Sequence, residues 1–351
     1  MANNLSRSQN FGGSNQERGP RPYDFVYFPD EPPTENHPPG HDKYLSDHLH
    51  GTLFLTLKVY TALHISTGVV VMGSDINRKD IPLIKTMVQG RNKKLLIQGS
   101  SLKGCIRSIY EAITNSRMGV QPKNTDQYPY PPERLPSDNI NQLCPASIVF
   151  GTSGEGWGWQ SLVSIQDAYY QATGYEIGFM PNLHSPQLDN EVYYLNDETI
   201  GRKFYYNMKH AIDKGEGNGI PAQVALEDEI FITKLIFKNL KPEELGTLLI
   251  ALGQDKEYPL ILKVGAGKPI GMGSMMIKID KAQVLQNQAD LKLRYTSFIT
   301  PSNLYLTDKS LTNFIEERIK EAHEKLIEKP QLDKLSKILN PVTNHVPYEK
   351  Y

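Results

Sequence analysis

Residues 99–113, which read GSSLKGCIRSIYEAI, combine the residue types that bind phosphate groups at the start of a helix. Ser100 and Ser101 precede an apolar pattern of helical period, and the first backbone N–H groups of such a helix are free to hold an anion. Lys103 and Arg107 are four residues apart and therefore share one helical face. The spacing predicts a phosphate-binding surface at the beginning of this helix.

Residues 264–279, VGAGKPIGMGSMMIKI, form a second candidate phosphate site, a glycine-rich loop between two apolar strands. A P-loop needs its lysine before Ser or Thr at the head of a helix, and a dinucleotide fingerprint must open a helix. Here Pro269 follows Lys268 and a strand comes next, so both nucleotide sites are excluded. What remains is a turn that lets another backbone approach closely, with one lysine for charge. The loop residues expected to bind nucleic-acid phosphates are Gly265, Gly267, Lys268, Gly271 and Gly273.

The segment 76–110 is the basic part of a chain whose formal net charge is −1. It contains eight Lys and Arg residues against Asp80 alone. The overall charge argues against a protein that coats nucleic acid without specificity, whereas a local basic site is compatible with RNA binding. The alternative for the lysines of this loop is a solvated surface without a ligand.

The composition, with 39% hydrophobic residues in 351, is sufficient for a globular core. Cys105 and Cys144 are too few for a disulfide framework or a zinc site, and Cys105 is expected to pack in the core. The absence of a signal peptide and of a long apolar segment predicts a cytoplasmic protein without a membrane partner.

The apolar pattern predicts an α+β protein. Strands are expected at 51–60, 148–150, 162–165, 230–237, 259–264 and 274–280, and helices at 100–117 and 242–252. This order is the β-α-β-β-α-β arrangement of ferredoxin-like and RNA-recognition domains. The predicted organisation is an irregular arm over 1–50, this core over 51–285 with inserted loops at about 64–98, 114–145 and 171–225, and a helical extension over 286–351.

Several motifs in this order resemble the RAMP superfamily of CRISPR-associated proteins. They are GSSLKG at 99–104, LCPASIVFG at 143–151, SIQDA at 164–168 and GAGKPIGMGS at 265–274. PYDFV at 22–26, GRKFYYN at 201–207 and LKPEELGTLLIALG at 240–253 are similar to one branch of that superfamily, which is associated with type III interference complexes.

The resemblance implies a backbone subunit of a type III effector. Such a subunit binds guide RNA, presents a thumb-like insert between guide and target RNA, and assembles with other backbone subunits and a large subunit. The motif GRKFYYN adds Arg202 and Lys203 to the candidate RNA contacts, which also include Arg78 of the basic segment and His64 near the same loop, with packing as the alternative for His64.

In the catalytic members of the superfamily, an aspartate before the GSSLKG helix cleaves target RNA with a divalent metal. The resemblance places that role on Asp80, with Asp75 as the rival, and implies Mg²⁺ or Mn²⁺ and no organic cofactor. A carboxylate there could hold a hydrated metal or orient a ribose 2′-OH for in-line attack. The alternative is that Asp80 pairs with Lys79 or caps a turn. Two other functions stay open, a non-catalytic assembly subunit and a guide-processing endoribonuclease.

Overall fold

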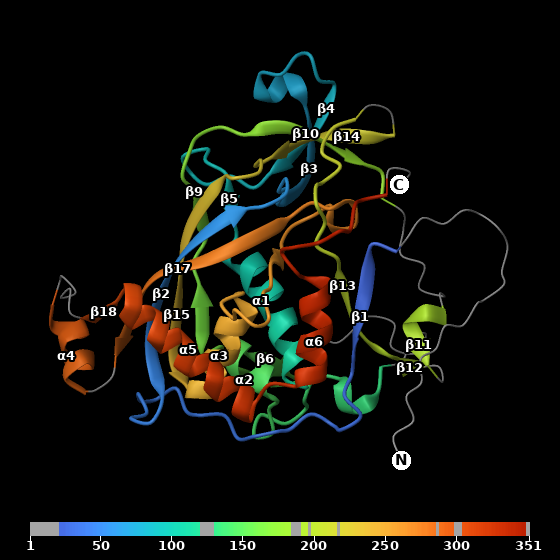
Figure 1. The fold of residues 1–351 in the computed structure, drawn as a ribbon. Helices are drawn as coiled ribbons and strands as arrows, with labels where there is room; N and C mark the ends of the chain where they lie inside the picture. Colours follow the sequence, from blue (N-terminus) through green and yellow to red (C-terminus); the bar gives the residue numbers. More distant parts are fainter. Residues whose placement is uncertain are drawn as a thin grey trace.

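The computed structural model describes residues 21–119, 130–183, 191–195, 198–215, 218–285, 288–297 and 304–348. Residues 1–20 of the predicted N-terminal arm and 120–129 of the second predicted insert lie outside this part. The described chain is a mixed α+β structure, as expected, with helices packed on a large antiparallel sheet (Figure 1). None of its helices is both long and apolar enough to span a bilayer.

The main sheet is built around β2 (Leu49–Val59), which pairs antiparallel with both β15 (Ile230–Leu240) and β17 (Ser274–Leu285). Leu53, Leu55, Leu57 and Val59 alternate along β2 and are all buried. Each buried leucine of this kind stabilises the fold by about 1.5–3 kcal/mol. The two-residue period therefore fixes which face of the sheet meets the helices.

The strands follow the order β16-β17-β2-β15-β9-β5, with β8 also on β15 and β18 on β17. The remaining members are β5 (Leu96–Ile97), β8 (Val163–Ile165), β9 (Ala168–Tyr170), β16 (Leu262–Lys263) and β18 (Tyr305–Leu306). Because β16 and β17 flank the glycine loop and β5 leads into the first helix, both phosphate-binding candidates are attached to this one sheet.

One face of the main sheet is covered by helices α1 (Gly99–Ile113), α2 (Pro145–Phe150), α3 (Pro242–Ala251), α5 (Asp308–Lys325) and α6 (Lys329–Ile338). Helix α4 (Gln288–Thr296) lies apart from them beside the end of β17, where Arg294 donates to Gln283. Helix α3 begins at Pro242, as predicted, and the Lys241 N–H before it donates to Glu244 Oε2 at 2.8 Å. The C-terminal pattern forms α5, which packs on α3, and α6, which contacts α1.

A second sheet, in the order β10-β14-β4-β3, is formed by two of the predicted inserts. Its strands are β3 (Ser66–Met72), β4 (Leu83–Met87), β10 (Glu176–Pro181) and β14 (Gly219–Val224). Three smaller pairs are β1 (Tyr23–Tyr27) with β13 (Gly201–Tyr205), β6 (Thr152–Gly154) with β7 (Trp157–Trp159), and β11 (Tyr194–Leu195) with β12 (Glu198–Thr199). The segments 64–98 and 171–225, which show no clear period in sequence, thus contain paired strands.

The strand expected at 148–150 is wrong, because these residues end helix α2. Pro145 occupies the first turn, where its missing N–H costs no hydrogen bond, and Gly151 ends the helix at a φ of 84°. All six residues of α2 are buried, so the helix shows no amphipathic period.

Candidate nucleic-acid interface

The glycine loop between β16 and β17 is shaped by four left-handed backbone positions. The φ angles are 79° at Gly265, 71° at Gly267, 85° at Gly271 and 81° at Gly273. A Cβ at Gly271 would also lie 2.3 Å from the carbonyl oxygen of His210. Only glycine combines this conformation with such close backbone contact, so the loop is a rigid turn packed against the segment after β13.

Lys263 holds this loop from beneath. Its buried Nζ donates hydrogen bonds to the Gly271 carbonyl at 3.0 Å and to the Ser274 hydroxyl at 3.1 Å. Burial, together with the charge of Lys268, lowers the pKa of Lys263 to about 7. The Ser274 hydroxyl in turn donates to Asn207 Oδ1 at 2.7 Å. Sequence analysis missed Lys263, whose only signal is a lysine within the apolar run ILKV.

Helix α1 begins at Gly99 with a carboxylate beside it. The Gly99 N–H donates to Asp167 Oδ1 at 2.8 Å, and no side chain of Gln98 caps the helix. Ser100 is exposed, and Ser101 is half-buried. The first N–H of the predicted anion site is therefore already bonded to Asp167, a residue of the SIQDA motif. The Ser101 and Leu102 N–H groups donate to the Gln98 carbonyl at 3.0 Å and 3.2 Å, so the exposed Ser100 is the part of this turn that a ligand can reach.

The α1 helix and the glycine loop lie side by side in the fold. The Cys105 thiol donates to the Lys263 carbonyl at 3.3 Å, which joins the second turn of α1 to the strand that enters the loop. Burial raises the pKa of Cys105, and the positive charge of Lys268 opposes that rise. Lys103 is half-buried two residues earlier, and burial followed by the charge of Arg107 lowers its pKa. Lys268 thus lies close enough to influence the Cys105 thiol, whereas Lys103 belongs to the same helix but points away from Cys105.

Arg107 and Arg202 bind a single buried carboxylate, that of Glu111. Arg107 Nε donates to Glu111 Oε1 at 2.7 Å, and Arg202 Nη1 donates to Glu111 Oε2 at 2.8 Å. Arg107 also donates to the Gly151 carbonyl, and Arg202 to that of Ser116, each at 2.7 Å. Both arginines, predicted as RNA contacts, are therefore bonded within the fold. Arg202 joins β13 to α1 and to the chain that follows α1, and Arg107 joins α1 to the residue that follows α2.

Lys203 is enclosed by three tyrosine rings. Its Nζ lies 4.0 Å from the ring centre of Tyr23, 5.1 Å from that of Tyr205 and 5.4 Å from that of Tyr193. It also donates to the Tyr193 hydroxyl at 3.2 Å. Cation–π contacts of this kind stabilise the pairing of β1 with β13. Tyr23 and Phe25 of β1 therefore pack against the domain at this point.

His64 lies beneath the glycine loop and is fully buried. Its Nδ1 is 2.7 Å from the Gln223 carbonyl, and its Nε2 is buried without a hydrogen-bond partner among the described residues. Burial lowers the pKa of His64, the Gln223 bond opposes this, and the charge of Lys85 adds to it. The His64 carbonyl accepts the Ala266 N–H at 3.0 Å, so this residue positions the loop through its backbone.

Asp80 and Asp75 lie at the tip of the β3–β4 hairpin, which projects away from α1 at the top of the molecule (Figure 1). Arg78 donates to Asp80 through Nε at 3.1 Å and through Nη2 at 3.0 Å. This bidentate bond lowers the pKa of Asp80. Asp75 is exposed within a 3₁₀ turn (Gly73–Ile76). The predicted catalytic carboxylates therefore lie apart from the contact between α1 and the glycine loop.

A divalent metal does not fit the protein side chains of this hairpin. Among the described residues no cluster of three or more His, Cys, Asp or Glu side chains could hold an ion. Both oxygens of Asp80 also accept hydrogen bonds from Arg78. A hard cation such as Mg²⁺ prefers several oxygen ligands, so one paired carboxylate does not make a metal site.

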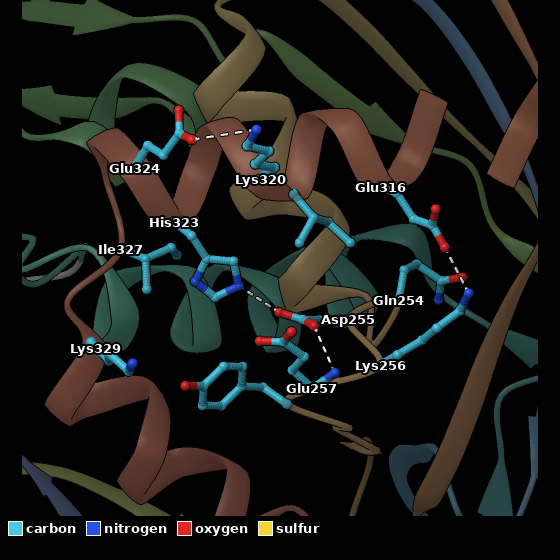
Figure 2. Close-up of a pocket in the computed structure, with 12 residues that line it drawn as sticks. Gln254, Asp255, Lys256, Glu257, Glu316, Lys320, His323, Glu324, Ile327 and Lys329 are labelled. Carbon is cyan, nitrogen blue, oxygen red and sulfur yellow. Dashed lines mark hydrogen bonds and ion pairs between the residues drawn. The ribbon is translucent and has the colours of Figure 1, made fainter. Parts of the chain in front are cut away.

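A separate pocket of about 530 Å³ lies between the chain after α3 and helix α5 (Figure 2). Asp255 Oδ2 is 2.7 Å from His323 Nε2, and Tyr258 lies beside the histidine ring. Lys256 pairs with Glu316, and Lys320 pairs with Glu324, so most of the charge on its wall is neutralised. The residues of this pocket come from segments far apart in the sequence, and nothing in their local pattern singles them out.

The family comparison agrees with the ordered motifs. The model of the RAMP superfamily matches residues 56–276, which begin in β2 and end in β17. The match includes α1, the glycine loop and the β3–β4 hairpin, and it excludes α5 and α6. No curated protein matches the chain.

Proposed function

The chain belongs to the RAMP superfamily of CRISPR-associated proteins, and from this membership we propose that it binds guide RNA where α1 meets the glycine loop. The observation that carries the proposal is the contact between Cys105 and Lys263, which unites two motifs more than a hundred residues apart. Lys268 lies close enough to influence Cys105, Lys103 belongs to the first turns of the same helix, and neither lysine forms an ion pair with a carboxylate among the described residues. Cations of this kind bind phosphates and release counterions.

We infer that the core is the ferredoxin-like variant of the RNA-recognition fold. In chain order its four strands are β2, β8 with β9, β15 and β17, and the helices α1 and α3 fall in the expected intervals. The sheet order β17-β2-β15-β9 with antiparallel pairs supports this inference. The partners proposed from the superfamily are the guide, the target RNA, further backbone subunits and a large subunit of a type III complex.

We propose further that target RNA is cut beside Asp80. In the reaction the ribose 2′-oxygen gives its proton to solvent water and attacks the adjacent phosphorus, while the bond from phosphorus to the 5′-oxygen breaks and that oxygen takes a proton from water, so that the products are a cyclic phosphate and a 5′-hydroxyl. Arg78 lowers the pKa of Asp80, so this carboxylate suits hydrogen bonding to the 2′-OH better than proton storage. DNA, which has no 2′-OH, should resist cleavage. No step is assigned to a metal, because the side chains of the hairpin do not gather its ligands.

A non-catalytic assembly subunit is the second candidate function. It is favoured by the bidentate bond between Arg78 and Asp80 and by the separation of the hairpin from the α1 contact. The two functions share the guide-binding surface and differ only at Asp80 and Asp75.

The RNA-binding proposal is tested by titrating a labelled single-stranded guide with the full chain at several salt concentrations. Replacing Lys103 and Lys268 with alanine should reduce the slope of log K against log salt by about 1.4, the value for two phosphates on a single strand. Lys256→Ala is the matched control, since Lys256 is exposed and paired with Glu316. An unchanged slope in the double variant would refute this surface.

Cleavage is tested in the assembled complex with guide and target. Asp80→Asn should abolish one cut while guide occupancy persists, and Asp75→Asn should leave that cut intact. If chelation and both substitutions spare every cut, the non-catalytic subunit is correct. Isolated protein that cleaves repeat RNA in EDTA would instead identify a guide-processing enzyme.

A further inference from the structure

The face of the main sheet opposite α1 and α3 carries exposed apolar and aromatic side chains. Tyr169 is 49% exposed, Ile232 44% and Met276 43%. The strand register places Tyr169, Ile232, Thr56 and Lys278 in one row across β9, β15, β2 and β17. Side chains in such a row point to the same face, so these residues form one continuous surface.

The next row centres on Phe54, which lies between two lysines. Lys234 of β15 and Lys281 of β17 are both paired in register with Phe54. Their Nζ atoms lie 5.1 Å and 4.8 Å from the centre of its ring. Tyr305 of β18 contacts the same ring from the side, at 5.8 Å between centroids. An aromatic ring and two cations are thus held together on the sheet.

Two lysines of this face form ion pairs with aspartates, and two others do not. Lys58 pairs with Asp228 at 2.6 Å, and Lys278 pairs with Asp280 at 3.4 Å. Lys234 and Lys281, by contrast, have no carboxylate partner in the described part of the chain. The uncompensated positive charge of the face is therefore concentrated around the Phe54 ring.

We propose that this face binds single-stranded RNA, with a base stacked on Phe54 and neighbouring phosphates bound by Lys234 and Lys281. Sheets that recognise single strands use aromatic side chains as stacking platforms, and cations beside them bind the backbone. A protein partner fits less well, because lysine is depleted in the cores of protein interfaces. The two cations complement the phosphates of a polyanion, and the aromatic ring complements its flat bases.

The proposed face adjoins the glycine loop. Ser274 ends the loop and begins β17, and its carbonyl accepts the N–H of Tyr60, the residue after β2, at 2.8 Å. Met276 and Lys58, only two residues further into the sheet, are paired in register and belong to the open face. One RNA strand can therefore pass from the loop onto this face, although binding at Phe54 does not depend on the loop.

The test is a titration of the full-length chain with oligouridine, which has no stable secondary structure, at several salt concentrations. Phe54→Leu keeps an apolar side chain but removes the stacking ring, and it should weaken binding roughly 5- to 150-fold. Lys234→Ala with Lys281→Ala should lower the salt slope by about 1.4. The matched control, Lys58→Ala with Lys278→Ala, removes two cations already neutralised by aspartates and should change the slope by less than half as much.

A photo-crosslink with 4-thiouridine in the same oligomer should join RNA to the peptide that contains Phe54. The proposal is overturned if that peptide is not labelled, or if Phe54→Leu and the Lys234/Lys281 variant bind as tightly as the unmodified chain. Loss of subunit association with intact RNA affinity would also overturn it and would assign the face to a protein. Lys268→Ala distinguishes the two proposals. If the glycine loop does not bind RNA, this variant binds RNA like the unmodified chain, and the crosslink to the Phe54 peptide still forms.

Discussion

Replacing Glu111 with leucine tests whether Arg107 and Arg202 serve the fold and not the RNA. The side chain of Glu111 is 7% exposed, that of Arg202 8% and that of Arg107 18%, so all three charges are largely removed from water. Removing one partner of a buried ion pair leaves the other charges uncompensated, which typically costs about 3–5 kcal/mol. Here a single carboxylate bonds to two guanidinium groups, so we expect a loss of stability within that range.

The assay is equilibrium unfolding in urea, with the midpoint and the slope both measured. The Glu111→Leu variant should shift the midpoint strongly without changing the slope, which would indicate lower stability of an unchanged native state. Glu316→Gln is the matched control. It breaks the exposed pair with Lys256 and should cost about 0–1 kcal/mol.

The reasoning is refuted if Glu111→Leu unfolds at nearly the same urea concentration as the unmodified chain. It is also refuted if Arg107→Ala leaves stability unchanged and lowers the salt slope of RNA binding, because Arg107 would then be a phosphate contact. A third variant, Arg202→Lys, retains the charge but loses the hydrogen bonds to both Glu111 and Ser116. It should be destabilised less than Glu111→Leu.

Three further outcomes are expected. Lys263 has a folded pKa of about 7 against an ordinary value near 10.5, so the unfolded chain binds more protons between these values. Stability should therefore rise with pH across that window, and the rise should be smaller in Lys263→Met, as measured by urea midpoints from pH 6 to 10. Gly271→Ala should destabilise the loop by about 1–3 kcal/mol and weaken guide binding, because its φ is 85° and its Cβ would meet the His210 carbonyl; full stability in thermal unfolding would contradict this. Lys103→Ala should lower the salt slope of guide binding by about 0.7, the value for one phosphate, with an unchanged unfolding midpoint.

The sequence predicts the elements whose pattern reflects a single buried face. Alternating leucines identify β2, and Pro242 with an apolar stripe identifies α3, because burial on one side imposes a period. Helix α2 is missed since it is buried all round. The strands β3, β4, β10 and β14 are missed for another reason. Strand β3 is exposed along most of its length and so has no buried face, and β4 pairs with β14 of a distant insert, so local periodicity carries little information about this sheet.

The candidate site is predicted in part. Sequence identifies the α1 start and the glycine loop, and the fold places Cys105 against Lys263 between them. The pairing of Arg107 and Arg202 with Glu111 could not be predicted, because it depends on how β13 packs on α1. The same holds for Lys203, whose tyrosine neighbours come from β1, from β13 and from the turn before β11. Residue type alone does not distinguish a cation bound within the fold from one available to a ligand.

This distinction changes what the basic segment 76–110 implies for RNA binding. Its eight positive charges include Arg78, paired with Asp80, and Arg107, paired with Glu111. A phosphate that displaced such a carboxylate would gain little, because one ion pair would replace another. The salt dependence of binding should therefore follow the unpaired lysines, and it should be smaller than the number of basic residues in the segment predicts. Part of it should come from Lys234 and Lys281, which lie outside the segment altogether and which its charge does not reveal.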